Sequence, residues 1–175
     1  MLINLSDVLT TEGKVVREEV PLEMTVFVNG SGAYDIVGKS PVELVFTNIG
    51  LDKARVEGSC KLRFVASCDR CLAEVPVTLE LNLDRTIVSP GTITEDEETE
   101  DDQGIMEGYH LDTEALVYDE IIVNWPMKIL CREDCKGVCL VCGQNLNERE
   151  CGCDTFVPDP RMAAIKDIFN ASKEV

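Results

Sequence analysis

Eight of the nine cysteines stand in closely spaced pairs, an arrangement that lets thiolates converge on a metal ion. The pairs are Cys68 with Cys71, Cys131 with Cys135, Cys139 with Cys142, and Cys151 with Cys153. Two thiolates so close in sequence can reach one tetrahedral zinc ion, about 2.3 Å from each sulfur. The sequence therefore predicts structural Zn²⁺. For the last four cysteines, an iron–sulfur cluster and uncoordinated thiols are the alternatives.

Four pairs can be joined into two four-cysteine sites in three ways. The simplest way joins Cys68 and Cys71 with Cys131 and Cys135, and leaves a local site made by Cys139, Cys142, Cys151 and Cys153. In that local site Gly143 can take a positive φ, which lets backbone N–H groups approach the sulfurs. The Asn145-Leu146-Asn147 segment then predicts a tight return of the chain. The other two pairings, and one ion in place of two, stay open.

The remaining reactive side chains have simpler interpretations. The Cys68–Cys71 pair could be a redox motif, but such a motif normally opens a helix, whereas here a strand is expected to begin at Val75. Cys60 alternates with apolar residues and is predicted to be an inert thiol in the core. His110, the one histidine, is predicted to lie on the surface before a helix.

The patterns of a catalytic site are missing from the sequence. A catalytic zinc keeps one coordination position open and normally uses His or Glu beside a general base. The chain has neither the His-x-Glu pattern of zinc deaminases nor the glycine-rich phosphate loop Gly-x-x-x-x-Gly-Lys-Ser/Thr. We therefore expect no enzyme and no small-molecule substrate.

Alternating apolar and polar residues predict the elements that position these cysteines. Strands are expected over 24–29, 42–47, 60–67 and 75–84, with turns at 30–32, 48–50 and 89–91. Strands that are apolar on one side suit an antiparallel sheet with one face in water. The predicted fold class is α+β: an antiparallel β-sheet with a few helices and a cysteine-rich, zinc-binding C-terminal module.

The second half of the chain predicts helices and a change of domain. A helix is expected over 112–124, capped by Asp112 and ended by Trp125-Pro126. Residues 1–126 would form a β-rich domain, with an acidic loop over 92–108 that cannot bury apolar area. Residues 127–175 would form the zinc module, which ends in a helix that begins near Asp159-Pro160.

The composition of the chain indicates its cellular compartment and the surfaces that it can bind. The 175 residues are 45% hydrophobic and carry a formal net charge of −17, which argues against a general polyanion-binding surface. No apolar run reaches the ~20 residues of a membrane span, and the first residues lack the pattern of a signal peptide. The sequence therefore predicts a cytoplasmic protein that does not bind a membrane. In that reducing compartment, abundant cysteines indicate metal or redox chemistry.

Several of these motifs together resemble the YceD/YlbN family of large ribosomal RNA subunit accumulation proteins. The resemblance runs from about Val56 to the C-terminus. It rests on the cysteine spacings and on three further segments, which are Cys68-Asp69-Arg70-Cys71-Leu72, Leu111-Asp112 with Asp119-Glu120-Ile121-Ile122, and Cys142-Gly143-Gln144-Asn145-Leu146-Asn147 with Asp159-Pro160-Arg161. It implies a cytoplasmic, non-enzymatic role in the synthesis, processing or accumulation of large-subunit (23S) rRNA, with no catalytic residues.

The expected partner is a large-subunit rRNA precursor or a basic ribosomal protein or assembly factor. Basic side chains that could form an RNA contact are Lys61, Arg63, Arg70, Lys136, Arg149 and Arg161. They could equally be ordinary solvated bases of an acidic protein. The alternative functions are a sensor that releases zinc when its thiols are oxidised, a zinc-stabilised protein-interaction module, and a zinc enzyme.

Overall fold

The structure is a computed structural model that describes residues 1–50, 52–90 and 104–153. Its largest part is a six-stranded antiparallel sheet. The strands are β2 (Val15–Val20), β3 (Val26–Asn29), β4 (Gly32–Lys39), β5 (Val42–Gly50), β6 (Lys53–Ser67) and β7 (Glu74–Val88). A smaller sheet joins β1 (Leu2–Asn4), β9 (His110–Asp112) and β8 (Met106–Glu107), and the helices are α1 (Ser6–Thr10) and α2 (Thr113–Asn124). The predicted antiparallel α+β fold is confirmed.

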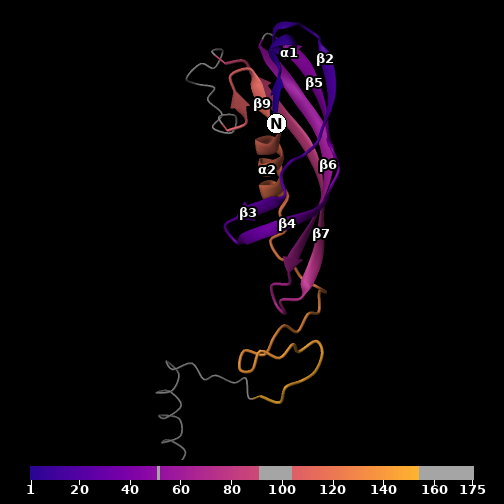
Figure 1. Cartoon of the computed structure of the whole chain (residues 1–175), viewed down its shortest axis with the longest axis vertical. Helices are drawn as coiled ribbons and strands as arrows, with labels where there is room; N and C mark the ends of the chain where they lie inside the picture. Colours follow the sequence, from indigo (N-terminus) through magenta and orange to yellow (C-terminus); the bar gives the residue numbers. More distant parts are fainter. Residues whose placement is uncertain (51, 91–103, 154–175) are drawn as a thin grey trace, which may run out of the picture.

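The two longest strands, β6 and β7, organise the larger sheet. They pair antiparallel from Lys53↔Val88 to Ser67↔Glu74. Along its other edge β6 pairs first with β5 and then with β4, so it contacts three strands. Gly58 permits this close packing, because a Cβ at that position would lie 2.5 Å from the Glu43 carbonyl oxygen. The β6–β7 pair extends from the sheet toward the cysteine-rich end of the molecule (Figure 1).

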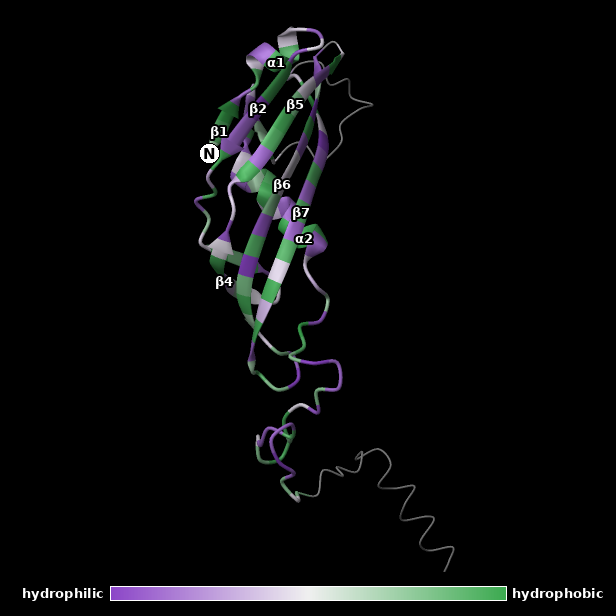
Figure 2. Ribbon diagram, turned by 90° about the vertical axis from the view of Figure 1, so that its right-hand side faces the viewer, coloured by the Kyte–Doolittle hydropathy of each residue, from purple (hydrophilic) through white to green (hydrophobic). Residues whose placement is uncertain are grey.

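Period-2 alternation gives the sheet one apolar face and one polar face. Hydrophobic and hydrophilic residues alternate along β6 and β7 (Figure 2), and the inward side chains of β6 are buried from Ala54 to Ala66, with Gly58 half-buried. Helix α2 covers the apolar face (Figure 1). Just after α2, the Trp125 ring lies 4.9 Å from the Phe27 ring and 5.1 Å from the Phe64 ring, measured between centroids. Apolar and aromatic burial therefore holds this part together.

Helix α2 begins and ends where its sequence signals predict. The Asp112 carboxylate accepts hydrogen bonds from the backbone N–H groups of Glu114 and Ala115, at 3.0 and 3.4 Å. These bonds satisfy two of the orphan donors of the first turn. Trp125 and Pro126 follow directly after the helix. No helix in the described part of the chain has the length and apolar character that a membrane crossing requires.

Some elements differ from the expectations. Strand β8 and the buried Ile105 lie inside the predicted acidic loop 92–108, because apolar Ile105 and Met106 interrupt the acids there. That prediction was wrong for residues 104–108, and the earlier part of the loop lies outside the described residues. The predicted C-terminal helix near 159–169 also lies outside them. The sequence patterns did not predict α1, β1, β2, β4 or β9.

Candidate metal centres

The first cysteine group consists of Cys68, Cys71, Cys131 and Cys135, and its first pair lies in the turn between β6 and β7. The Cys68 N–H donates to the Ala73 carbonyl at 2.8 Å, and the Leu72 N–H donates to the Cys68 carbonyl at 2.9 Å. Leu72 has φ = 62°, a left-handed conformation that is uncommon outside glycine. This tight turn, and not a helix N-terminus, carries the motif, as expected for a metal-binding hairpin.

Asp69 and Arg70 tie the segment after α2 to this turn. The Asp69 N–H donates to the Ile129 carbonyl at 2.8 Å, and the Asp69 carboxylate accepts from the Ile129 N–H at 2.7 Å. The Arg70 carbonyl accepts from Val138 N–H at 3.0 Å, and Gly137, at φ = 78°, passes so close that a Cβ would lie 3.0 Å from the same carbonyl oxygen. These bonds bring Cys131 and Cys135 back to the hairpin across about 60 residues of sequence.

The sulfur positions of the first group fit a tetrahedral ion. The Sγ atoms of Cys68 and Cys135 are 3.8 Å apart, and those of Cys71 and Cys131 are 3.5 Å apart. All four lie within 4.8 Å of one another. Zn–S bonds of about 2.3 Å at tetrahedral angles place sulfurs about 3.8 Å apart. Four sulfur donors make a set that suits zinc.

The electrostatics of the first group also favour a cation. Burial opposes ionisation of Cys68, but backbone N–H groups, that of Cys131 foremost, lower the pKa of its thiol to about 6. Conversely, the hydrogen bond with Cys71, and then burial, raise the pKa of Cys131 to about 12. One thiolate therefore forms readily while the last resists the charge of its neighbours. A divalent cation among the sulfurs would remove that repulsion.

The second cysteine group consists of Cys139, Cys142, Cys151 and Cys153, whose Sγ atoms also lie within 4.8 Å of one another. Gly143 has φ = 72° and donates its N–H to the Cys139 carbonyl at 2.8 Å, the turn that the sequence predicts. The Val141 N–H points at the Cys139 sulfur, 3.4 Å away. The simplest partition of the four pairs is therefore the one found in the structure.

The second group shows the same opposition of pKa values. Backbone hydrogen bonds from Cys142 and Val141 lower the pKa of the Cys139 thiol to about 6. Hydrogen bonds with Cys142 and Cys151, together with burial, raise the pKa of Cys153 to about 12. The group is more open than the first, because Cys142 is exposed and Cys151 and Cys153 are half-buried, whereas Cys68, Cys71 and Cys135 are buried.

The ninth cysteine and the histidine lie where the sequence predicts them. Cys60 is buried among apolar residues, and burial raises the pKa of its thiol to about 11, so it is an inert core thiol. His110 is exposed in β9, beside α2. Sequence reasoning missed the side chains around the sulfurs, chiefly Asp69 and Asn147. The signal for them is the placement of turn-forming residues inside or just after the cysteine motifs.

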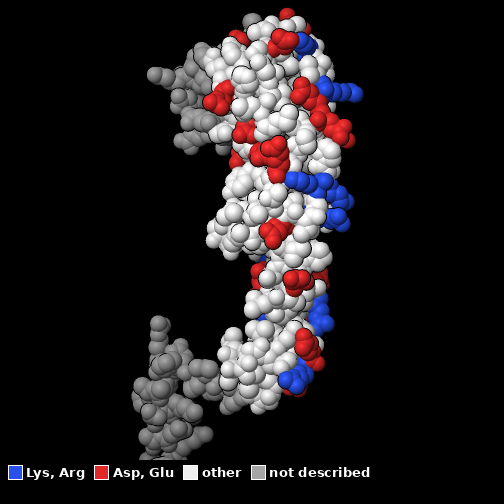
Figure 3. All heavy atoms as spheres, in the orientation of Figure 1, with Lys and Arg blue, Asp and Glu red and all other residues white. Residues whose placement is uncertain are grey.

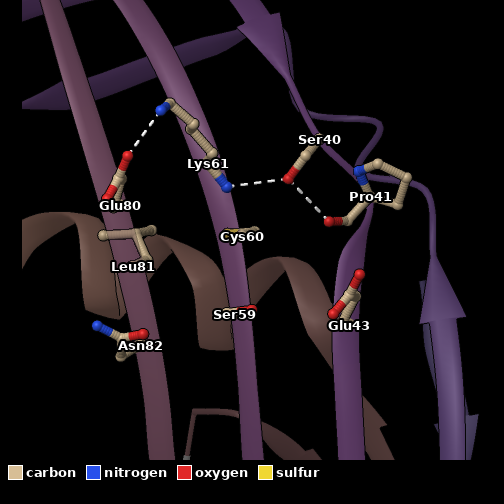
Figure 4. Close-up of a pocket in the computed structure, with 9 residues that line it drawn as sticks. All are labelled: Ser40, Pro41, Glu43, Ser59, Cys60, Lys61, Glu80, Leu81 and Asn82. Carbon is tan, nitrogen blue, oxygen red and sulfur yellow. Dashed lines mark hydrogen bonds and ion pairs between the residues drawn. The ribbon is translucent and has the colours of Figure 1, made fainter.

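Two of the predicted RNA contacts, Lys61 and Arg63, lie on the polar face of β6. The Lys61 ammonium donates to the Glu80 carboxylate at 2.6 Å, and its backbone N–H donates to the Ser40 hydroxyl at 2.9 Å (Figure 4). Lys61, Glu80 and Ser40 line a shallow pocket of about 290 Å³ on this face. Arg63 lies across Gly38 of β4, where a Cβ would come 2.7 Å from its Nε. Lys61 is therefore already paired with an acid.

The remaining predicted RNA contacts lie near the cysteines. Arg70 donates to the Cys135 carbonyl at 2.9 Å, and Arg149 donates to the Gln144 side chain at 3.0 Å. Lys136 is exposed beside Cys135, and Arg161 lies outside the described residues. In Figure 3 basic side chains follow one edge of the molecule and are interspersed with acids. The five described bases are therefore spread along the molecule and do not form one patch.

Comparisons with known proteins found a family model and several relatives that are similar to this chain. A family model described as large ribosomal RNA subunit accumulation protein YceD matches residues 56–169. An uncharacterized protein of Mycobacterium tuberculosis is 28% identical over 119 residues, which cover 68% of this chain and 57% of that protein. An uncharacterized protein of Mycobacterium leprae is 30% identical over 91 residues, covering 52% and 42%. The chain thus spans about half the length of these relatives. No solved structure matches it.

Proposed function

The chain belongs to the large ribosomal RNA subunit accumulation protein YceD family, and from that premise we propose that it supports accumulation of large-subunit rRNA without catalysing a reaction. The observation that carries this proposal is the family match over residues 56–169, which spans both cysteine groups. In this proposal the protein works in the cytoplasm, where reducing conditions keep its thiols available for metal.

Each cysteine group would hold one structural Zn²⁺. The support is a donor set of four sulfurs within 4.8 Å in each group. Four thiolates fill the tetrahedral shell and leave no position for a water or a substrate, which is the arrangement of a structural site. The zinc would tie the segment after α2 to the β6–β7 turn. We therefore propose that the metal builds a binding surface and takes no part in catalysis.

The partner we favour is a basic protein of the large subunit or of its assembly. The support is electrostatic: the chain carries a formal net charge of −17, and Lys61 on the polar face of the sheet is paired with Glu80. Basic proteins are attracted to such a surface, whereas RNA is repelled unless bases are segregated. Direct RNA contact through Lys61, Arg63, Arg70, Lys136, Arg149 and Arg161 is the other outcome that the experiment below distinguishes.

A thiol sensor is the second candidate, and the exposure of Cys131 and Cys142 favours it. An exposed thiolate ligand can be oxidised, and the metal is then released. Mild peroxide treatment separates the two functions. Retained metal and unmodified cysteines would exclude the sensor, whereas release of zinc from the second group at low peroxide would support it.

The proposed function is tested in cells that carry the chain with the paired change Cys68→Ser and Cys71→Ser. We expect the ratio of mature large-subunit to small-subunit rRNA to fall as far as in cells without the protein. The matched control is Cys60→Ala, which removes a thiol from the same strand region outside both groups and should leave the ratio unchanged. An unchanged ratio in cells without the protein would contradict the proposal.

Crosslinking of the wild-type chain in the same cells identifies the partner. Enrichment of ribosomal or assembly proteins without RNA crosslinks would support the basic protein partner. Direct crosslinks from the chain to precursor rRNA would instead assign the RNA contact. Enrichment of neither would argue against a role in the assembly of the large subunit.

A further inference from the structure

Asn147 belongs to the loop of the second cysteine group but bonds to the first. Its side-chain nitrogen Nδ2 lies 3.2 Å from the Cys135 sulfur. Its Oδ1 accepts from the Lys136 N–H at 2.8 Å and from the Arg132 guanidinium at 2.8 Å. The amide therefore touches a sulfur ligand, the backbone next to that ligand and a neighbouring side chain, all on the 131–136 segment.

The loop of the second group holds Asn147 in that position. Asn145 Oδ1 accepts from both the backbone N–H and the side-chain nitrogen of Asn147, at 3.0 and 2.9 Å. Asn145 itself forms a β-bridge with Val138, and Leu146 N–H donates to the Gly137 carbonyl at 2.9 Å. Because this loop lies between Cys142 and Cys151, an ion that joins those cysteines closes it and fixes Asn147.

An N–H donor stabilises a thiolate relative to a thiol and so strengthens its binding to a cation. Cys135 is 3% exposed, so little water can replace a lost donor. The Asn147 amide is thus placed to act on the first metal site from outside its ligand set. The arrangement also explains why asparagine occurs twice in the Asn145-Leu146-Asn147 segment. Asn147 bonds the Cys135 sulfur, and Asn145 orients Asn147.

We propose that Asn147 is a positioning residue of the first cysteine group, through which metal at the second group strengthens metal binding at the first. Because coupling between two binding equilibria is reciprocal, metal at the first group strengthens the second by the same factor. The inference rests on the metal occupancy proposed above and is independent of the role in rRNA accumulation.

The test uses the full chain and ¹¹³Cd²⁺, whose separate NMR resonances report the two groups individually during competition with a chelator. Four chains are compared: wild type, Cys142→Ser with Cys153→Ser, Asn147→Leu, and the triple variant. Asn147→Leu keeps the size of the side chain and removes its donor. Asn82→Leu, on the exposed side of β7, is the matched control for the same change on the sheet.

We expect metal affinity at the first group to fall about tenfold when the second group is disabled, and about tenfold in Asn147→Leu, as for other outer-shell residues. The triple variant should be no weaker than the double cysteine variant, because both changes remove the same bond. The first-group resonance of Asn147→Leu should also shift, since the N–H···S bond is lost. Asn82→Leu should match the wild type.

Two results would overturn the inference while leaving the metal sites standing. The first is equal first-group affinity in all four chains. The second is an additive loss of about 100-fold in the triple variant, which would show that coupling runs through the short Cys135–Cys139 link and not through Asn147. Failure of the wild type to bind metal at either group would remove the metal proposal and this inference together.

Discussion

The sheet and the cysteine end of this molecule differ in the side chains that they bury. The sheet body, which comprises both sheets and α2, encloses large side chains such as Phe27, Phe46 and Phe64, each with no exposed surface. The cysteine end, which comprises residues 68–73 and 127–153, has a buried cluster made of Cys68, Cys71 and Cys135, and three partly buried apolar side chains among the described residues pack against it. Apolar burial can stabilise the first, but the second lacks the area for it.

The difference teaches which part of the chain needs a ligand in order to fold. Much of the cysteine end consists of turns and bends. Its backbone bonds to the β6–β7 turn are those of Ile129 with Asp69 and of Val138 with Arg70. Few residues there recover the entropy of ordering through contacts with apolar neighbours. Sulfurs that meet without a cation would also repel one another as they ionise. We therefore expect the cysteine end to depend on metal, and the sheet body to be independent of it.

Metal removal should produce the largest difference between the cysteine end and the sheet body. A strong chelator at neutral pH should abolish hydrogen-exchange protection of the Cys139 and Gly143 amides, because the free energy of metal binding is the folding free energy of such a module. The β6 amides from Ala54 to Phe64 should keep their protection. Equal loss of protection in both parts, or no loss in the cysteine end, would contradict the division.

The opposite change removes apolar volume from the sheet body. Phe64→Ala should lower the free energy of unfolding by about 3–5 kcal/mol, because it leaves a cavity beside Phe27 and Trp125. Denaturant unfolding measures the loss, and metal analysis of the still folded fraction should show an unchanged stoichiometry. A fall in the stoichiometry would show that the two parts form one cooperative unit.

The two parts also differ in how well the sequence predicts them. The cysteine groups, helix α2 and the strands β5, β6 and β7 follow from spacing, capping and strict alternation, which are local signals. Strand β2 was missed because only Val20 among its six residues is buried. Strand β4 was missed because its adjacent apolar residues Ile36 and Val37 break the apolar–polar alternation of the sequence, although the burial of its residues alternates. The bond between Asp69 and Ile129 spans 60 residues, so its partner could not be predicted from local spacing. Asn147 bonds residues 11 to 15 positions earlier, and its place among turn-forming residues is the one local signal for it.

Acidification should weaken metal binding at the cysteine end without destabilising the sheet body. With Cys131 and Cys153 at pKa values of about 12, each metal-free group still carries protons at pH 8. Bound metal must displace those protons, so affinity should fall by at least about tenfold per pH unit from pH 8 to 6. Below about pH 6 the fall should steepen as Cys68 and Cys139 take up protons too. Chelator competition at several pH values measures this.

The sheet body should be insensitive to the same change of pH. Its bonds to Lys61 and Arg55 hold the pKa values of Glu80 and Asp84 below those of ordinary carboxylates. A lowered pKa contributes stability that is present above the unfolded value and is lost only as pH falls through the folded value. Denaturation midpoints of the sheet should therefore stay constant from pH 8 to 6. A parallel decline of sheet stability and metal affinity would contradict this separation.

A smaller effect concerns the cap of α2. Asp112→Ala should lower the free energy of unfolding by about 1 kcal/mol, since it removes the acceptor for the Glu114 and Ala115 N–H groups. Asp112→Asn is the matched control, because asparagine caps about as well, and it should recover most of the loss. Metal content should not change in either variant. A loss of metal in Asp112→Ala would mean that the helix also positions the segment that carries Cys131.

The smallest expected effect is that of Lys61→Gln. Its ion pair with Glu80 is exposed, with side chains 55% and 73% accessible, and such pairs add little to stability. Arg55→Gln, which breaks a two-bond contact with Asp84 at 2.9 and 2.7 Å, should lower the melting temperature more. Calorimetry compares the two variants. If Lys61→Gln left stability intact but abolished RNA crosslinks in cells, Lys61 would be an RNA contact and the sheet face a second binding surface.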